Sequence, residues 1–185
     1  NAWNKANDGD LKAIGNTTIS PIRLYSKKIT SLSQIKSGDT IAVPNDASNE
    51  SRALYVLKNA GLIGLSVSGD TLATVKDINS NPKNLVIKEL DAAQTPRALD
   101  SITAAVINDD FATTAKLTVE ESIYTEPVNK DSEQWINIIV ANKKDANNKI
   151  YKEVVKAYQT EATKKAIEKA YPDKRKIAAW GLKLD

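Results

Sequence analysis

The chain has 185 residues, 41% of them hydrophobic, which is enough apolar material for one packed domain or two small lobes. Its 26 basic and 23 acidic residues are interleaved and give a formal charge of only +3, so nucleic acid is not an expected partner. The sequence contains no Cys and no His, which excludes disulfides within the chain and removes the commonest general base and zinc ligand. An enzyme built on this chain would depend on carboxylates, Lys, Tyr or a cofactor.

Short apolar segments predict strands along the chain, and capping or turn residues predict helices between them. The predicted strands are 19–26, 41–43, 85–87, 102–107 and 136–141, and the predicted helices start at or just after Ser31, Asn49, Thr74, Thr95, Asp145 and Thr160. We expect the helix from Asn49 to end at Gly61, in a left-handed conformation. This alternation predicts an α/β fold with a mostly parallel sheet covered on both faces.

Residues 41–62 form the most informative unit, in which a short strand is followed by a polar turn and a helix. With Asn49 as the N-cap, Arg52 falls in the first helical turn, where a cation opposes the positive end of the helix macrodipole. A negative group is therefore expected beside Arg52. One explanation is a bound carboxylate or phosphate, and the alternative is that Arg52 lies in solvent or pairs with Glu50 or Asp46.

A second polar cluster, residues 108–110, follows the strand 102–107. Ligands of α/β sheets bind beyond the carboxyl ends of the strands, so this cluster and residues 45–52 are expected to line one cleft. Asn137 is a polar residue in an otherwise apolar strand. It either has buried hydrogen-bond partners or faces solvent by simple alternation.

Six segments, in order along the chain, point to a known family. They are LYSKK at 24–28, IAVPNDASNESRAL at 41–54, LKNAGLI at 57–63, ATVKDINSNPKNL at 73–85, AVIND at 105–109 and NIIVANKKD at 137–145. With these segments the chain resembles, from about Ala2 to Tyr171, the methionine-binding lipoproteins of bacterial ABC importers, the NlpA type.

The resemblance implies the type II periplasmic-binding-protein fold, in which two α/β lobes joined by two crossing strands close on a small ligand. Residue 1 matches a point inside the family pattern, so we expect one complete lobe plus part of the second, with the N-terminal segment of the first lobe absent. The expected division is 1–21 as a remnant of the first lobe, 22–142 as the second lobe with the hinge strands, and 143–185 as C-terminal helices that return to the first lobe.

The resemblance implies ligand-binding roles for three residues of the turn and the helix. Arg52 would bind the ligand carboxylate bidentately, which agrees with the macrodipole argument. Asn49 and Asn45 would shape the turn and donate hydrogen bonds to the ligand.

Three further ligand-binding residues are implied. Asn108 and Asn137 match positions that fix the amino and carboxylate groups of the amino acid, since a side-chain amide both donates and accepts. Trp135 stands where the family usually has Tyr, and it would either form a wall of the pocket or pack in the core.

The implied function is capture of methionine, or a related amino acid or short peptide, outside the cytoplasm for an ABC permease, without catalysis and without a cofactor. The sequence does not distinguish L-methionine, D-methionine and a dipeptide. No apolar run approaches the roughly 20 residues that span a bilayer, so membrane attachment would come from a lipidated N-terminal Cys that is absent from this chain.

Two other classes remain open, an enzyme on the same scaffold and a ligand-sensing domain. The enzyme would have only Asp46, Asp109 and Asp110 as acid–base candidates near the expected cleft. A domain-exchange dimer of the chain is also left open, because a lobe without its mate exposes apolar surface.

Overall fold

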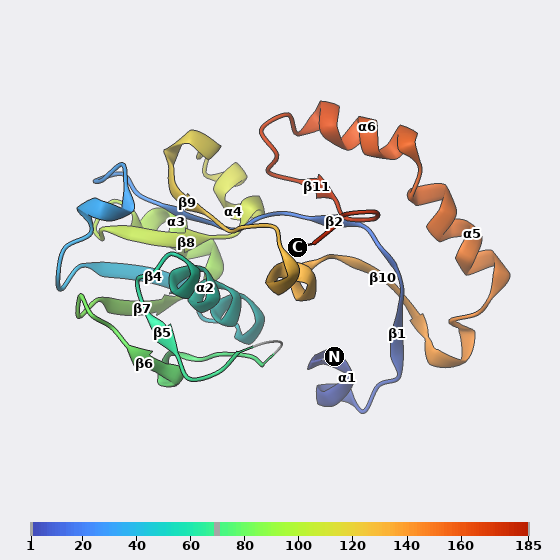
Figure 1. The fold of residues 1–185 in the computed structure, drawn as a ribbon, viewed down its shortest axis with the longest axis horizontal. Helices are drawn as coiled ribbons and strands as arrows, with labels where there is room; N and C mark the ends of the chain where they lie inside the picture. Colours follow the sequence, from blue (N-terminus) through green and yellow to red (C-terminus); the bar gives the residue numbers. More distant parts are fainter. Residues whose placement is uncertain (1, 69–70, 185) are drawn as a thin grey trace. The chain divides into compact units, whose positions relative to one another are not determined.

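The computed structural model describes residues 2–68 and 71–184, which fall into two compact units (Figure 1). Unit 1 comprises Asn1–Ser20 and Ser132–Asp185, and unit 2 comprises Pro21–Asp131. The chain therefore crosses between the units twice, and unit 2 is a continuous segment inserted into unit 1. Residues 132–142, which the sequence-based division assigned to the second lobe, are grouped with unit 1, and the division into lobes stays a prediction.

Unit 2 is built on one five-stranded sheet with the order β7-β4-β8-β3-β9. β4 runs parallel to both β7 and β8, whereas β3 is antiparallel to β8 and to β9. The sheet is therefore mixed: β3 is its one reversed strand, and the predicted parallel arrangement is found for β7, β4 and β8. The strand bounds are Arg23–Tyr25 for β3, Thr40–Pro44 for β4, Val86–Leu90 for β7, Ala104–Ile107 for β8 and Ser122–Thr125 for β9.

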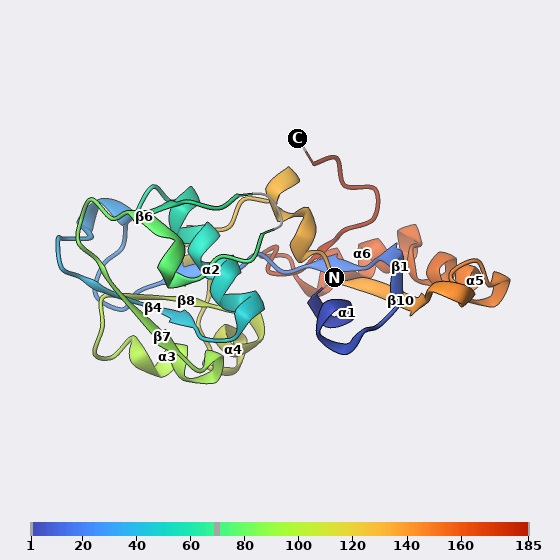
Figure 2. The same cartoon turned by 90° about the horizontal axis from the view of Figure 1, so that it is seen from below.

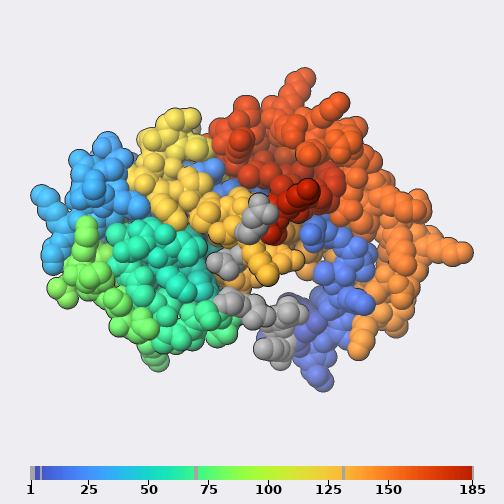
Figure 3. All heavy atoms as spheres, in the orientation of Figure 1, coloured from blue at the N-terminus to red at the C-terminus, as the bar shows by residue number. Residues whose placement is uncertain are grey.

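Helices cover both faces of this sheet, as the alternation of elements predicted. Helix α2 (Ala47–Asn59) lies on one face, and the short helices α3 (Thr95–Ala98) and α4 (Asp109–Thr114) lie on the other (Figure 2). In the space-filling view the blue-green atoms around α2 form part of the near surface of unit 2 (Figure 3).

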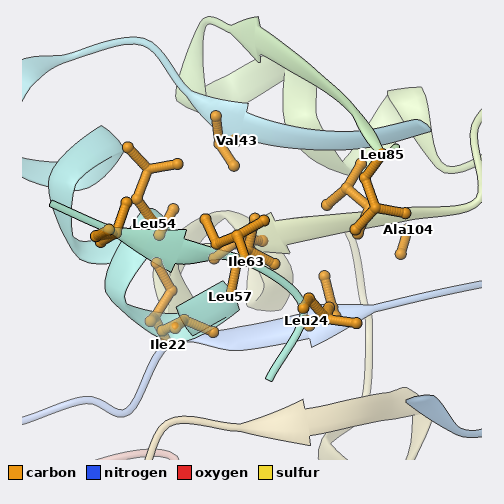
Figure 4. Packing of buried hydrophobic residues seen from close by; sticks show 14 of the residues in the cluster. Ile22, Leu24, Val43, Leu54, Leu57, Ile63, Leu85 and Ala104 are labelled. Atoms are coloured by element: carbon orange, nitrogen blue, oxygen red, sulfur yellow. The ribbon is translucent and has the colours of Figure 1, made fainter. Parts of the chain in front are cut away.

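Alternate side chains of the strands supply two hydrophobic clusters, one on each face. In β4, Ile41 and Val43 pack into the cluster that contains Leu57 of α2, while Ala42 packs into the cluster that contains Leu99. Figure 4 shows the first of these clusters, in which side chains from α2 meet side chains from the strands. The sheet thus fixes α2, and with it the polar turn that precedes the helix.

Both ends of α2 are closed by specific hydrogen bonds. Asp46 is the N-cap, and its side chain accepts a hydrogen bond from the Asn49 N–H at 3.1 Å. The prediction that Asn49 is the N-cap is therefore wrong by three residues, because Asp46 already satisfies the first turn and Asn49 lies inside it. The predicted end is confirmed: Gly61 has φ +72°, and the Leu62 N–H donates to the Leu57 carbonyl at 3.0 Å.

The rest of unit 2 consists of short elements. β5 (Gly64–Leu65) pairs with β6 (Ile78–Ser80) in a small antiparallel sheet. Ser31 starts the predicted short helix, and its N–H donates to the Gln34 side chain at 3.1 Å.

The 3-10 helices among the described residues of both units span Leu32–Gln34, Val75–Asp77, Ala92–Gln94, Val119–Glu121, Lys130–Trp135 and Lys143–Asp145.

Unit 1 contains two small antiparallel sheets and three helices among its described residues. β1 (Leu11–Asn16) pairs with β10 (Ile138–Asn142), and β2 (Thr18–Ile19) pairs with β11 (Ile177–Ala178). The predicted strand 19–26 is thus broken near Pro21, which has no N–H to donate, into β2 of unit 1 and β3 of unit 2.

The helices of unit 1 are α1 (Ala2–Asn7), α5 (Lys149–Tyr158) and α6 (Glu161–Ala170). Thr160 caps α6 as predicted, and its hydroxyl accepts from the Thr163 N–H at 3.1 Å. Helix α5 begins later than its predicted start at Asp145, because Asn148 is its N-cap. None of the helices described combines the length and apolar character that crossing a membrane requires.

Replacing Leu57 by Ala is expected to lower the free energy of unfolding by about 2–5 kcal/mol, because the side chain is 0% exposed and the surrounding cluster cannot close the cavity. Urea denaturation measures the loss. The matched control is Val86→Ala on the sheet edge, where the side chain is 54% exposed and the expected loss is below about 1 kcal/mol. Equal losses in the two variants would contradict the assignment of Leu57 to the core.

Candidate functional site

The ends of β4 and β8 bring the two predicted polar clusters together. These strands are parallel neighbours, so the turn after β4 and the turn after β8 meet at one edge of the sheet. There Asn108 Nδ2 donates to Asn49 Oδ1 at 2.7 Å. Asn45 lies exposed in the turn before α2. The two clusters therefore lie together, as their positions after parallel strands predicted, and the direct contact between these two amides joins them. That they line one cleft stays a prediction.

Arg52 lies at the same edge, but not in the first turn of α2. The helix begins at Ala47, so Arg52 is its sixth residue and belongs to the second turn. The field of the macrodipole fades within the first turn. The macrodipole argument from the sequence therefore does not apply at this position. Arg52 nevertheless has a negative partner in the structure.

The negative partner of Arg52 is Glu126. Arg52 Nε donates to Glu126 Oε1 at 2.9 Å, and Arg52 Nη2 donates to Glu126 Oε2. The side chains are only 11% and 5% exposed. The alternative of an Arg52 side chain in solvent is wrong, and the carboxylate shown here is Glu126, which the sequence analysis did not name. The other explanation, a bound anionic ligand, stays a prediction.

Glu126 also connects β9 to the start of β3. Its carboxylate accepts from the Ile22 N–H at 3.1 Å, and its own N–H donates to the Ile22 carbonyl at 3.0 Å. Three donors from two different segments thus satisfy one buried carboxylate, which is what a desolvated charge requires. Sequence reasoning missed Glu126, since no local pattern connects it to a residue 74 positions away.

A second buried ion pair lies at this edge of the sheet. Arg23 Nη1 is 3.7 Å from Asp109 Oδ1 and also donates to the Pro21 carbonyl at 3.1 Å. The two side chains are 3% and 5% exposed. Of the acid–base candidates of the enzyme alternative, Asp109 thus takes part in an ion pair, and Asp46 caps α2.

Trp135 and Asn137 belong to unit 1, whereas the other four predicted site residues belong to unit 2. The backbone of Asn137 donates to the Thr18 carbonyl at 2.9 Å and accepts from the Thr17 N–H at 2.8 Å. Its side chain is exposed, as the alternation argument allowed, while Trp135 is half-buried. Their ligand-binding roles stay predictions.

Burial also affects two titratable groups close to these elements. Glu50 is buried on α2, and this burial raises the pKa of its carboxyl group above the ordinary value even though the Val75 N–H donates to it at 3.0 Å. Desolvation, followed by the charge of Glu126, raises the pKa of the Tyr124 hydroxyl.

The raised pKa of Glu50 has a defined effect on stability. The folded state retains the Glu50 proton more tightly than the unfolded chain does, so the contribution of Glu50 to stability falls as the pH rises from about 4.5, the unperturbed pKa, through the raised pKa of the folded state. Glu50→Gln removes this ionisation and keeps an acceptor for the Val75 N–H. We expect its stability relative to the unaltered protein to increase with pH across this range, as measured by urea denaturation at several pH values.

The control for this pH series is Glu120→Gln, which changes an exposed carboxylate. Its stability difference from the unaltered protein should not grow with pH in the same way. A constant difference for Glu50→Gln across the same range would show that Glu50 does not carry the raised pKa.

The architecture matches that of substrate-binding proteins of transporters. A substrate-binding protein of a methionine transporter from Streptococcus pneumoniae superimposes with a TM-score of 0.83 at 49% sequence identity, covering 97% of this chain and 72% of that one. A nutrient-binding protein from Burkholderia cenocepacia, solved bound to methionine, gives a TM-score of 0.85 at 40% identity, with 97% and 74% coverage. The fold is that of a transporter substrate-binding protein.

The family follows from the sequence comparison. The model of the NlpA lipoprotein family matches residues 1–180, and the chain belongs to this family. The probable D-methionine-binding lipoprotein MetQ of Vibrio cholerae is 43% identical over 162 residues, which are 87% of this chain. The chain spans 59% of the length of that relative. These relatives are named as binding proteins and not as enzymes.

Proposed function

We propose that this chain is part of the substrate-binding component of an ABC importer and that it binds methionine or a related amino acid or short peptide. The observation that carries the proposal is the polar edge of unit 2, where the Asn49–Asn108 contact lies at the carboxyl ends of two parallel strands. Relatives that cover nearly all of this chain are named for methionine, which favours that ligand.

In the proposed site, a charged side chain and several side-chain amides of the protein bind the polar groups of the ligand. The guanidinium of Arg52 binds the ligand carboxylate, although it already binds one carboxylate within the protein. The amides of Asn49, Asn108 and Asn137 provide donors and acceptors for the amino and carboxylate groups. Asn45 belongs to the turn beside them, and Trp135 contributes an apolar surface.

The proposed mechanism is closure of two lobes around the ligand. The chain crosses between its two units only twice, as a hinge requires. A ligand that binds the closed arrangement more tightly shifts the population toward it, and the permease then recognises that arrangement. The lipoprotein relatives favour an extracytoplasmic location with lipid attachment to the membrane.

A thermal-shift panel of the full-length protein tests the ligand class. L-methionine, D-methionine, a methionine-containing dipeptide and glutamate are compared, and the bound methionine compound is expected to raise the melting temperature. At 100 times its Kd, a ligand that binds only the folded state stabilises it by about 2.7 kcal/mol. A panel in which glutamate alone raises the melting temperature would refute the methionine assignment.

Arg52→Ala is expected to weaken binding of L-methionine by about 2–5 kcal/mol, or roughly thirty-fold to several thousand-fold, because a desolvated charge pair loses one partner. Asn137→Ala is expected near the lower end of that range. Calorimetric titration measures both. The matched control is Arg97→Ala, which removes an exposed guanidinium of the same unit. Undiminished affinity in Arg52→Ala would remove this residue from the site.

A further inference from the structure

The carboxylate of Glu126 accepts hydrogen bonds from both Nε and Nη2 of Arg52. A bidentate contact between a carboxylate and these two nitrogens fixes the plane of the guanidinium as well as its position. An arginine side chain has several rotatable bonds, and this contact restricts the directions in which the Arg52 N–H groups point. Glu126 itself is held by hydrogen bonds to Ile22 on both its backbone and its side chain.

We propose that Glu126 is a positioning residue, which orients Arg52 for the carboxylate of an amino-acid ligand. The inference rests on the proposed function and adds a residue that touches Arg52 and acts through it. A guanidinium oriented before binding loses less conformational entropy when the ligand arrives, and this preorganisation increases affinity.

Through Glu126, Arg52 is also connected to the two segments of unit 2 that lie next to the crossings between the units. Ile22 lies two residues after the first crossing, and Glu126 precedes the second by five residues. One backbone hydrogen bond, from the Glu126 N–H to the Ile22 carbonyl, and one from the Ile22 N–H to the Glu126 carboxylate place these two segments side by side in unit 2. The orientation of Arg52 is therefore set by the segments next to the hinge and not by α2 alone.

Glutamine at position 126 cannot reproduce this arrangement, although it has nearly the same shape. The carboxylate accepts from Arg52 Nε, Arg52 Nη2 and the Ile22 N–H. A side-chain amide has one acceptor oxygen, and its NH2 group would face a donor. At least one of these three N–H groups then loses its partner, and the guanidinium has to rotate.

The test compares Glu126→Gln and Glu126→Asp with Glu120→Gln, an exposed control, in the full-length protein. Each variant is titrated calorimetrically with L-methionine and with L-methionine amide, which has the same side chain and amino group but no carboxylate. We expect Glu126→Gln to bind L-methionine about ten-fold or more weakly, while binding of the amide changes much less, because the effect passes through Arg52. Glu126→Asp retains the charge and is expected to keep more of the preference for the carboxylate.

The ratio of the affinities for L-methionine and L-methionine amide distinguishes a positioning role of Glu126 from a purely structural one. If Glu126 only stabilised the fold, its loss would weaken both ligands by the same factor, and this result would overturn the inference. L-methionine binding at unaltered affinity by folded Glu126→Gln would also overturn it, and where Glu126→Gln does not fold, the selectivity of Glu126→Asp decides. If the unaltered protein bound neither compound, the proposed function would fall, and this inference with it.

Discussion

The Arg52–Glu126 ion pair removes two charges from water at the edge of the sheet, and this constraint shapes everything around it. Burying a charge is tolerated only when hydrogen bonds replace its hydration. Here the replacement comes from two elements, since Arg52 donates from α2 and Ile22 donates from the start of β3. The pair thus connects α2 to the segments next to β3 and β9, close to the polar edge at the ends of β4 and β8.

The parallel strands β4 and β8 supply the second constraint. Parallel neighbours end at the same edge, so the side chains that follow each of them are forced together whatever their distance in the sequence. The contact between Asn49 and Asn108, which are 59 residues apart, is a direct result. The cap at Asp46 fixes where α2 begins and therefore the position of Arg52 on its second turn, while Gly61 sets the other end of the helix.

The sequence predicted those features that depend on local chemistry or on the period of the hydrophobic pattern. Gly61 ended a helix and Thr160 began one because their conformations or hydroxyl groups act within a few residues. The meeting of the two polar clusters was predictable too, since it follows from the direction of the strands. The N-cap was misplaced because Asp46 and Asn49 are both good caps and only the backbone geometry selects between them. The partner of Arg52 was out of reach, because the β3–β9 pairing that brings Glu126 close leaves no trace near residue 52.

Ile22 and Glu126 are hydrogen-bonded to each other in unit 2, and Thr18 and Asn137 are hydrogen-bonded to each other in unit 1, so within each unit the two segments next to the crossings lie side by side. When the first and last segments of an insert are hydrogen-bonded to each other, the folding of the insert itself provides most of the loop-closure entropy that joining them costs. The more than one hundred residues between the crossings therefore add much less loop-closure entropy to the folding of unit 1 than an unstructured loop of the same length would.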